Sequence, residues 1–342
     1  MYRLSETRSH SVIGLFTPRG ARSGAAVLLA TVLLPLVAAI SHAQSGKTQV
    51  RPLYEGVGSD YVTRFSDPMG IYYDPVKDEC YIADTGNGQV VVFNASGMPV
   101  FRFYHYVSGR GGLLVTGQPQ NLVVDATGRI FLVDTKASYL DVLDPQGRSL
   151  GHIDVPSDNC GEPERFTHVT QGVDGTVYAV TACKTARIAV IHDTAITNVI
   201  ILHNPDAERF CVTGFAADPD GRFWMTNQCS QKMVQLYASD GSLVRAFGKH
   251  DTGYENFAFP AGIAVTRDGK LWIVDSIRQV VTHFDNEGNL LAMVGGKGSQ
   301  PGAFEYPCAV ATDGASRLFV LERQGSRYQC LQILEDEAAT QN

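Results

Sequence analysis

The sequence predicts an all-β fold: a single closed, six-bladed β-propeller of four-stranded antiparallel blades. Three observations lead to this prediction. A strand pattern recurs six times, an aromatic residue stands at one fixed place in each copy, and an early segment matches the strand that the last copy lacks. Units of about 48 residues with four short strands and no helical periodicity are typical of propeller blades.

A strand of five residues that ends in an acidic or polar side chain recurs in every copy. The six end residues are spaced 50, 47, 46, 48 and 47 positions apart. Since alternate residues of a strand face opposite sides, the aromatic residue three places earlier is positioned to pack against the next blade. The strands span residues 80–84, 130–134, 177–181, 223–227, 271–275 and 318–322, and their aromatic residues are Tyr81, Phe131, Tyr178, Trp224, Trp272 and Phe319.

Turn residues divide each copy into four strands. In four copies a glycine six places before the end residue marks the hairpin between the first and second strands. A third strand follows, as at residues 280–284, and after another glycine turn comes a fourth, as at residues 243–247. The hairpin glycines are Gly128, Gly175, Gly221 and Gly269.

The sixth copy ends after its third strand, and an early segment is predicted to complete it. Gly56 lies 12 residues before Pro68, as Gly248 lies 12 residues before Pro260. Residues 50–55 therefore occupy the place of a fourth strand, and we expect them to pair beside Leu331. Joining both ends of the chain in one sheet removes the open strand edges of the ring.

Residues 1–43 are predicted to be an export signal. Four arginines precede an apolar run of 16 residues, 25–40, and Ser41-His42-Ala43 has small residues at the −3 and −1 positions of a cleavage site. A membrane span needs about 20 residues. We therefore expect a cleaved leader, with a retained membrane anchor as the alternative, no membrane span after cleavage, and a periplasmic or secreted protein. Residues 44–335 would form the propeller and residues 336–342 a polar tail.

Composition limits the choice of partners. The chain has 342 residues, of which 44% are apolar and 18% charged, so it can bury a sizeable core. Its net charge is −7, and no basic run follows residue 43. Because Lys and Arg that neutralise phosphates supply most nucleic-acid affinity, we expect no nucleic-acid partner. The oligomeric state is left open.

The repeat resembles the NHL family of six-bladed propellers, in its exported bacterial type. The fifth copy is most similar, with Pro260-Ala261-Gly262-Ile263-Ala264-Val265 followed by Trp272-Ile273-Val274-Asp275. The third copy departs from the pattern, with Phe166 in the proline position and Thr181 at the strand end. The resemblance covers residues 50 to about 335 and implies the propeller fold. Propellers serve as enzymes, receptors and scaffolds alike, so function has to be argued from the site.

One rim of the central channel is the candidate site, because the blade-joining loops and the ends of the second strands meet there in such propellers. The carboxylates at the strand ends are candidates for a cation or a basic partner, or for hydrogen bonds with the backbone of their own turn. These strand-end residues are Asp84, Asp134, Thr181, Asn227, Asp275 and Glu322. They would meet the residues that begin the first strands, Gly70, Asn121, His168, Gly214, Gly262 and Ala309.

Asn121 and His168 stand where the other copies have glycine or alanine, so they bring polar groups to the channel mouth. An amide oxygen and a neutral imidazole are able to ligate calcium or zinc, or to form a hydrogen-bonded polar lining. Gluconolactonase-like hydrolases resemble this fold and hold a divalent cation with carboxylates and asparagine near the channel centre. That resemblance would assign Asn121, Asp134, Asn227 and Asp275 as ligands.

Other chemistries are not indicated. Peptidyl-hydroxyglycine lyases have a similar repeat and take zinc-binding histidines from the position after the proline. Here that position holds no histidine, and the sequence contains no Gly-x-Ser-x-Gly, Cys-x-x-Cys or phosphate-binding glycine loop. The residues at the position after the proline are Met69, Gln120, Thr167, Thr213, Ala261 and Cys308.

The cysteines predict disulfides. Cys183 and Cys229 each lie two residues past a second strand, and Cys160 and Cys211 precede the same blades. We therefore predict the pairs Cys160–Cys183 and Cys211–Cys229, with metal binding by these four as the alternative. An odd total of seven leaves Cys80, Cys308 and Cys330. Cys80 and Cys330 fall on neighbouring blades at the closure, where a bond between them is a weaker expectation.

A long segment between the first two blades carries aromatic residues and then glycines, from Phe101 to Gly112. A fourth strand should end near Tyr104, so these aromatic residues either pack at the blade edge or form a glycine-hinged lip for a partner.

Two functional hypotheses follow. The first is a non-catalytic scaffold that presents its channel rim to a protein, peptide or saccharide and needs no cofactor. The alternative is a metal-dependent hydrolase or lyase with a divalent cation, calcium or zinc, at the channel mouth.

Overall fold

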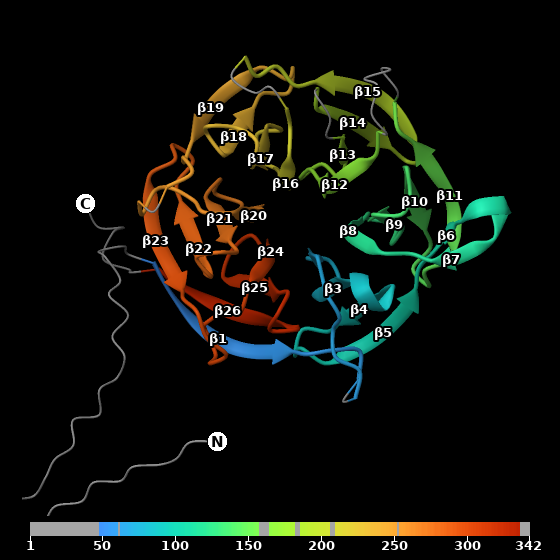
Figure 1. The fold of residues 1–342 in the computed structure, drawn as a ribbon, viewed down its shortest axis with the longest axis horizontal. Helices are drawn as coiled ribbons and strands as arrows, with labels where there is room; N and C mark the ends of the chain where they lie inside the picture. Colours follow the sequence, from blue (N-terminus) through green and yellow to red (C-terminus); the bar gives the residue numbers. More distant parts are fainter. Residues whose placement is uncertain are drawn as a thin grey trace, which may run out of the picture. The chain divides into compact units, whose positions relative to one another are not determined.

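The computed structural model describes residues 48–60, 62–156, 164–181, 185–205, 209–251 and 253–335. They form six four-stranded antiparallel sheets arranged around a central channel (Figure 1). The predicted six-bladed propeller is therefore confirmed. The predicted leader, the polar tail and the pair Cys160–Cys183 lie outside the described residues. Within the described residues, no helix is long and apolar enough to cross a membrane.

Each blade takes four strands in chain order, except the last. Blade 1 contains β2 (Gly70–Asp74), β3 (Glu79–Asp84), β4 (Gln89–Phe93) and β5 (Pro99–Tyr104). Blade 2 contains β8 (Pro119–Val124), β9 (Ile130–Asp134), β10 (Tyr139–Leu143) and β11 (Ser149–Asp154). Blade 3 contains β12 (Phe166–Gln171), β13 (Val177–Thr181), β14 (Arg187–His192) and β15 (Ala195–Ile201). Blade 4 contains β16 (Val212–Ala217), β17 (Phe223–Asn227), β18 (Val234–Tyr237) and β19 (Leu243–Phe247). Blade 5 contains β20 (Pro260–Val265), β21 (Leu271–Asp275), β22 (Val280–Phe284) and β23 (Leu290–Gly295). Blade 6 contains β24 (Pro307–Thr312), β25 (Arg317–Glu322), β26 (Arg327–Glu335) and β1 (Thr48–Gly56).

The core lies between neighbouring blades and is organised by the second strands. Of the six predicted aromatic residues, five are buried, and Tyr178 is half-buried. Tyr178 still packs edge-on against Phe223 of the next blade, with ring centroids 4.9 Å apart. The predicted hairpin glycines all have positive φ, for example 85° at Gly128 and 82° at Gly269, a conformation that other residues rarely adopt.

The ring is closed by β1, which pairs with β26 as predicted. Pro52 lies opposite Leu331 and Tyr54 opposite Cys330, with a bulge between them. An ion pair of 2.9 Å between Glu55 and Arg327 adds to this seam. The outer strand of the last blade is thus supplied by the start of the described chain, and no blade is left with three strands (Figure 1).

Four side chains link successive blades by donating hydrogen bonds to the carbonyl of the repeated proline. Thr85 donates to Pro119 at 2.7 Å, and Thr213 donates to Pro260 at 2.6 Å. Ser276 and Cys308 make the equivalent bonds to Pro307 and Pro68, so one of these links spans the closure.

The cysteines follow the prediction in part. Cys211 and Cys229 form a disulfide, as expected. Cys80, Cys308 and Cys330 are free thiols, so the expected bond between Cys80 and Cys330 is wrong. Both thiols lie in the same apolar cluster at the seam, but Cys330 is hydrogen-bonded with Tyr54 of the closing strand instead.

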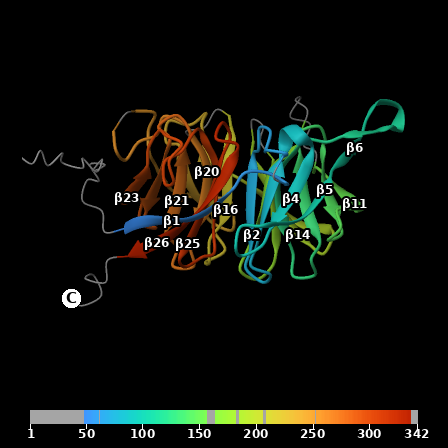
Figure 2. The ribbon, with the colours of Figure 1, turned by 90° about the horizontal axis from the view of Figure 1, so that it is seen from below.

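A hairpin that the sequence did not predict rises from the connection between blades 1 and 2. As expected, β5 ends at Tyr104, and the chain then forms β6 (Tyr106–Ser108) and β7 (Leu114–Thr116), which pair with each other. A short 3-10 turn, η2 (Arg110–Gly112), forms the tip. Figure 2 shows this hairpin extending beyond the ring at its upper edge.

Replacement of Thr85 by valine tests the links between blades. The exchange keeps the shape of the side chain but leaves the Pro119 carbonyl without its buried donor. We expect the free energy of unfolding to fall by about 1–3 kcal/mol in urea denaturation. Thr197→Val is the matched control, because the Thr197 hydroxyl also meets a backbone carbonyl but on the surface. Equal effects of the two exchanges would contradict a special role of the buried link.

Candidate functional site

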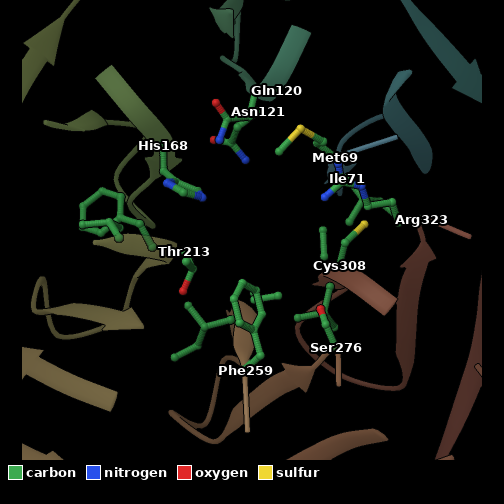
Figure 3. Close-up of a pocket in the computed structure, with 18 of the residues that line it drawn as sticks. Met69, Ile71, Gln120, Asn121, His168, Thr213, Phe259, Ser276, Cys308 and Arg323 are labelled. Carbon is green, nitrogen blue, oxygen red and sulfur yellow. The ribbon is translucent and has the colours of Figure 1, made fainter. Parts of the chain in front are cut away.

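One end of the central channel widens into a cavity of about 370 Å³. Its walls come from the first strands of all six blades, from loops that lead into the blades, which we call leading loops, and from residues just after the second strands. Figure 3 shows the side chains converging on the open centre. Most of the lining is apolar, as is usual for sites that bind small organic molecules.

Several sequence-predicted positions line this cavity. Asn121, His168, Gly214, Gly262 and Ala309 begin first strands and all contribute to the wall. Others were not predicted: Phe259 and Tyr306 from leading loops, and Ser276, Ile277 and Arg323 after second strands. Leading loops carry no periodic signal, so their side chains cannot be placed from sequence spacing.

The glycines around the channel reflect the close approach of neighbouring blades. A Cβ atom at Gly70 would lie 2.2 Å from the Gln120 carbonyl oxygen, and one at Gly214 would lie 2.9 Å from the Ile263 amide nitrogen. Blades 2 and 3 instead carry Asn121 and His168, and these side chains project into the channel (Figure 3). The ring is therefore polar on the side of blades 2 and 3.

His168 is the most distinctive titratable group of the cavity. Burial lowers the pKa of His168 to about 4, while a hydrogen bond with the Thr213 backbone opposes the shift. The imidazole is therefore neutral at neutral pH. Nδ1 is buried without a hydrogen-bond partner.

Asn121 stands beside His168 and is held by the next blade. Its Oδ1 accepts the Val169 backbone amide at 2.7 Å, so the side-chain amide group is the part left to face the channel. Gln120 lies next to it on the cavity wall (Figure 3). Blades 2 and 3 thus place the side-chain amides of Asn121 and Gln120, which are hydrogen-bond donors, next to the neutral imidazole of His168.

The opposite wall is mostly apolar, with one cation at its edge. Met69, Ile71 and Cys308 face the cavity there (Figure 3), and Arg323 lies beside them and is paired with Asp67. Burial raises the pKa of Cys308 to about 12, and its thiol donates to the Pro68 carbonyl at 3.2 Å. Cys308 is therefore a neutral structural thiol at neutral pH.

The channel continues to a second opening of about 640 Å³ at the other end of the ring. Both cavities share Asn121 and a constriction of four apolar side chains. These side chains are Ile71, Phe215, Ile263 and Val310. Asn121 is therefore the one polar residue at the constriction among the residues common to both cavities.

The predicted acidic and amide residues at the strand ends do not line the cavity. Asp84, Asp134, Asn227, Asp275 and Glu322 are fully buried, and each accepts a backbone amide of its own leading loop. The donors are Ser66, Gln118, Cys211, Ala258 and Glu305, at 2.6 to 2.9 Å. Of the two roles considered for these residues, this geometry corresponds to hydrogen bonding within the blade.

Blade 3 anchors its leading loop differently. Thr181 replaces the acceptor, and its hydroxyl makes only a long contact of 3.5 Å with the Arg187 carbonyl. Buried Arg187 donates to the Pro156 carbonyl at 2.5 Å and pairs with Glu164 at 3.2 Å. The loop is therefore held by a donor instead of an acceptor.

Asp134 also takes part in a buried charge cluster. His105 lies between Asp134, 2.8 Å from Nδ1, and Asp141, 3.1 Å from Nε2, and all three side chains are buried. Burial alone would lower the pKa of His105, but hydrogen bonds to the two carboxylates outweigh it and raise the pKa. His105 immediately precedes β6, so this cluster anchors the projecting hairpin.

A carboxylate-held cation does not fit this cavity. The described lining residues include no Asp or Glu, and the Asn121 oxygen is already bound to Val169. Nor do the described residues contain a group of three His, Cys, Asp or Glu side chains positioned to share a metal ion. Of the set Asn121, Asp134, Asn227 and Asp275, only Asn121 reaches the channel.

Comparison with known proteins identifies the fold and no closer relationship. No family profile matches the sequence, and no curated protein matches it. Among solved structures, a gluconolactonase from Xanthomonas campestris aligns with a TM-score of 0.59 and 15% identity over 84% of this chain and 91% of its own. Virginiamycin B lyase from Staphylococcus aureus aligns with a TM-score of 0.56 and 12% identity over 85% of this chain and 100% of its own. It has also been solved as a catalytically inactive histidine-to-alanine form with quinupristin. The calcium-binding protein regucalcin from Agrobacterium tumefaciens aligns with a TM-score of 0.58 and 15% identity over 82% of this chain and 95% of its own. The chain is thus a six-bladed β-propeller similar in fold to these proteins.

Removal of the His105 side chain should destabilise the protein strongly. His105→Ala leaves two buried carboxylates without their shared partner, and we expect a loss of about 3–5 kcal/mol of unfolding free energy. Because the folded-state pKa is raised, the stabilisation is complete below the ordinary pKa of 6.5 and is lost as pH rises through the folded-state value. Urea denaturation of both proteins across pH measures this, with the exposed His152→Ala as control. A stability difference that grows with pH would contradict the assignment.

His168 should make the folded protein less stable as pH falls, which is the opposite of the pH dependence expected from His105. Its pKa falls from 6.5 unfolded to about 4 folded, so the unfolded state binds the proton first. Stability is therefore lost as pH decreases from about 6.5 to 4. In His168→Gln this loss should be smaller, and urea midpoints across this range measure it. An NMR titration of His168 with an ordinary pKa would refute the argument.

Proposed function

We propose that this protein is an exported propeller enzyme of the hydrolase or lyase class that acts on a small organic molecule in the channel mouth. The observation that carries the proposal is the neutral imidazole of His168 in the wall of an apolar cavity. An imidazole kept neutral beside a cavity is suited to take a proton from a bound substrate or water.

The other residues of the cavity suggest what the substrate looks like. Apolar groups such as Ile71, Phe259 and Ile277 would contact a hydrocarbon body. The amide of Asn121 and that of Gln120 are positioned beside His168, where they would donate to a carbonyl oxygen. A small lactone or ester with an apolar body matches this arrangement, and the missing carboxylates disfavour a cationic substrate.

Two reaction types are open to this geometry. In hydrolysis, His168 accepts a proton from water as the water oxygen attacks the carbonyl carbon; the ester C–O bond then breaks, and the leaving alcohol oxygen takes the bonding pair and the proton from His168. In an elimination, His168 accepts a proton from the carbon beside the carbonyl, its electron pair forms the new double bond, and the leaving oxygen departs with the bonding pair. Neither step uses a cation, because the donor set for one is absent from the described lining.

The comparisons support the enzyme over a purely binding role by analogy of fold. Similar structures include a gluconolactonase and a lyase, and the lyase is described as inactive in a histidine-to-alanine form. At 12–15% identity this likeness concerns the fold, so residue roles are argued from the present cavity alone.

Export and the repeat type are part of the proposal. The Cys211–Cys229 disulfide is typical of an oxidising compartment, in agreement with the predicted leader. We assign the repeats to the NHL type on the motif of blade 5, Pro260-Ala261-Gly262-Ile263-Ala264-Val265 followed by Trp272-Ile273-Val274-Asp275. Binding of a protein, peptide or saccharide at the rim without chemistry is the second candidate, and the exposed Phe259, Ile277 and Tyr306 around the mouth favour it.

Incubation with δ-decalactone, phenyl acetate and quinupristin tests the enzyme proposal. Mass spectrometry separates the reactions, because hydrolysis adds one water and elimination within a ring leaves the mass unchanged. We expect turnover that persists with a chelator and falls at least about a hundredfold in His168→Gln with little change in KM. His192→Gln, an exposed histidine, should match the wild type. Turnover that His168→Gln leaves intact would contradict the role of His168, whereas binding without turnover would favour the second candidate.

A further inference from the structure

Exposed apolar side chains gather on the face of the propeller that contains the channel mouth. This face, which we call the mouth face, is formed by the leading loops, the hairpin β6–β7 and the turns after the second strands. Its exposed large apolar residues are Val62, Tyr106, Leu113, Leu114, Val115, Tyr254, Phe259, Ile277 and Tyr306. The turns of the opposite face expose Val76, Met98 and Val173.

The hairpin is the most prominent part of this face. Leu113 and Leu114 near its tip are each 72% exposed among the residues that the structure describes. Figure 2 shows the hairpin extending sideways beyond the ring, at the level of its upper edge. Two adjacent leucines held out on a rigid hairpin are costly in water, which points to an apolar environment that covers them.

Charge is distributed unequally between the two faces. No acidic residue occurs between Tyr104 and Gln118, while Arg110 is at the hairpin tip and Lys136 at its base. The turns of the opposite face hold many of the carboxylates, of which several are paired with Arg129, Arg148, Arg222, Lys270 or Arg317, while fewer, such as Asp60, Asp67, Glu255 and Glu305, lie in the leading loops of the mouth face. The carboxylates of the opposite face include Asp74, Asp78, Asp125, Asp144, Asp174, Asp193, Asp218, Asp220, Asp240, Asp268, Asp285, Glu287 and Asp313.

We propose that the mouth face docks on an anionic lipid bilayer, with the hairpin β6–β7 inserted into the headgroup region. The leucines would enter the acyl boundary, and Tyr106, Tyr254 and Tyr306 would lie at the headgroup level, where tyrosine is enriched. The acidic opposite face would point away from the negative surface, as electrostatics requires. A protein partner fits less well, because these apolar residues come from widely separated loops of the ring instead of one patch.

Docking in this orientation would also explain the apolar cavity. The mouth that contains His168 opens on the same face as the hairpin, so it would be directed at the bilayer. An apolar ligand could then pass from the lipid into the channel without crossing water. The docking itself does not depend on the proposed reaction.

A tryptophan placed at the hairpin tip provides a direct test. The chain has two tryptophans, Trp224 and Trp272, and both are fully buried, so their fluorescence is a constant background. In full-length Leu114→Trp, vesicles of phosphatidylcholine with phosphatidylglycerol should shift the emission to the blue, and brominated lipids should quench it. Val76→Trp, at a site on the opposite face that is at least as exposed, should show neither effect. The same N-terminal apolar run is present in both variants, so it cannot account for a difference between them.

Sedimentation with vesicles measures the strength of docking. We expect Leu113→Ser with Leu114→Ser to lower the partition coefficient by about tenfold or more, and Val76→Ser with Val173→Ser to leave it unchanged. Added salt should weaken binding to the anionic vesicles. Unchanged emission of Leu114→Trp, or equal loss of binding in the two serine pairs, would overturn the proposal. If the protein does not bind vesicles but binds a protein partner through the hairpin, the proposal would be overturned in favour of a protein partner.

Discussion

The mouth of the channel depends on one repeated interaction: an acceptor side chain at the end of the second strand binds a backbone amide of the leading loop. Buried loop amides need partners, and a carboxylate inside the blade provides one without a neighbouring strand. Asp275 binds the amides of Ala258 and Phe259, which places the Phe259 ring at the cavity. Glu322 binds the Glu305 amide, and Tyr306 follows directly. Burial raises the pKa of Glu322, and its hydrogen bonds oppose the shift. The buried carboxylates thus hold in place the leading loops whose side chains line the cavity, without lining it themselves.

The site is asymmetric because two blades break the repeat. Where glycine begins a first strand, neighbouring backbones come so close that no Cβ atom fits, as at Gly70 and Gly214. Blades 2 and 3 are spaced to admit Asn121 and His168, and blade 3 also lacks the usual acceptor and holds its loop through Arg187. A departure from a structural repeat removes local stabilisation, so it is retained most readily where it serves a function. The two departures meet at the same side of the channel.

Much of the fold could be predicted because strand period, turn glycines and aromatic spacing agree with one another; β9, β13, β17 and β21 begin and end where expected. The roles of side chains were harder to predict. The sequence around Asp134 would be the same whether its carboxylate faced a ligand or bound its own leading loop. The path of that loop decides which of the two roles Asp134 has. Arg323 and Tyr306 were missed for the same reason. The neighbourhood of Cys80 and Cys330 was predicted, but the Tyr54 hydroxyl on the closing strand satisfies Cys330.

The hairpin and the cavity share one anchor, which limits how each can move. Asp134 accepts the Gln118 amide that precedes β8 and also binds His105, which precedes β6. The chain returns from the hairpin through Gly117, where an added Cβ atom would lie 2.3 Å from the Asp134 carboxylate and 2.6 Å from His105. Such a tightly packed base leaves no hinge. The hairpin is therefore a rigid extension of the blade that carries Asn121, and contact at its tip would orient the channel mouth instead of opening it.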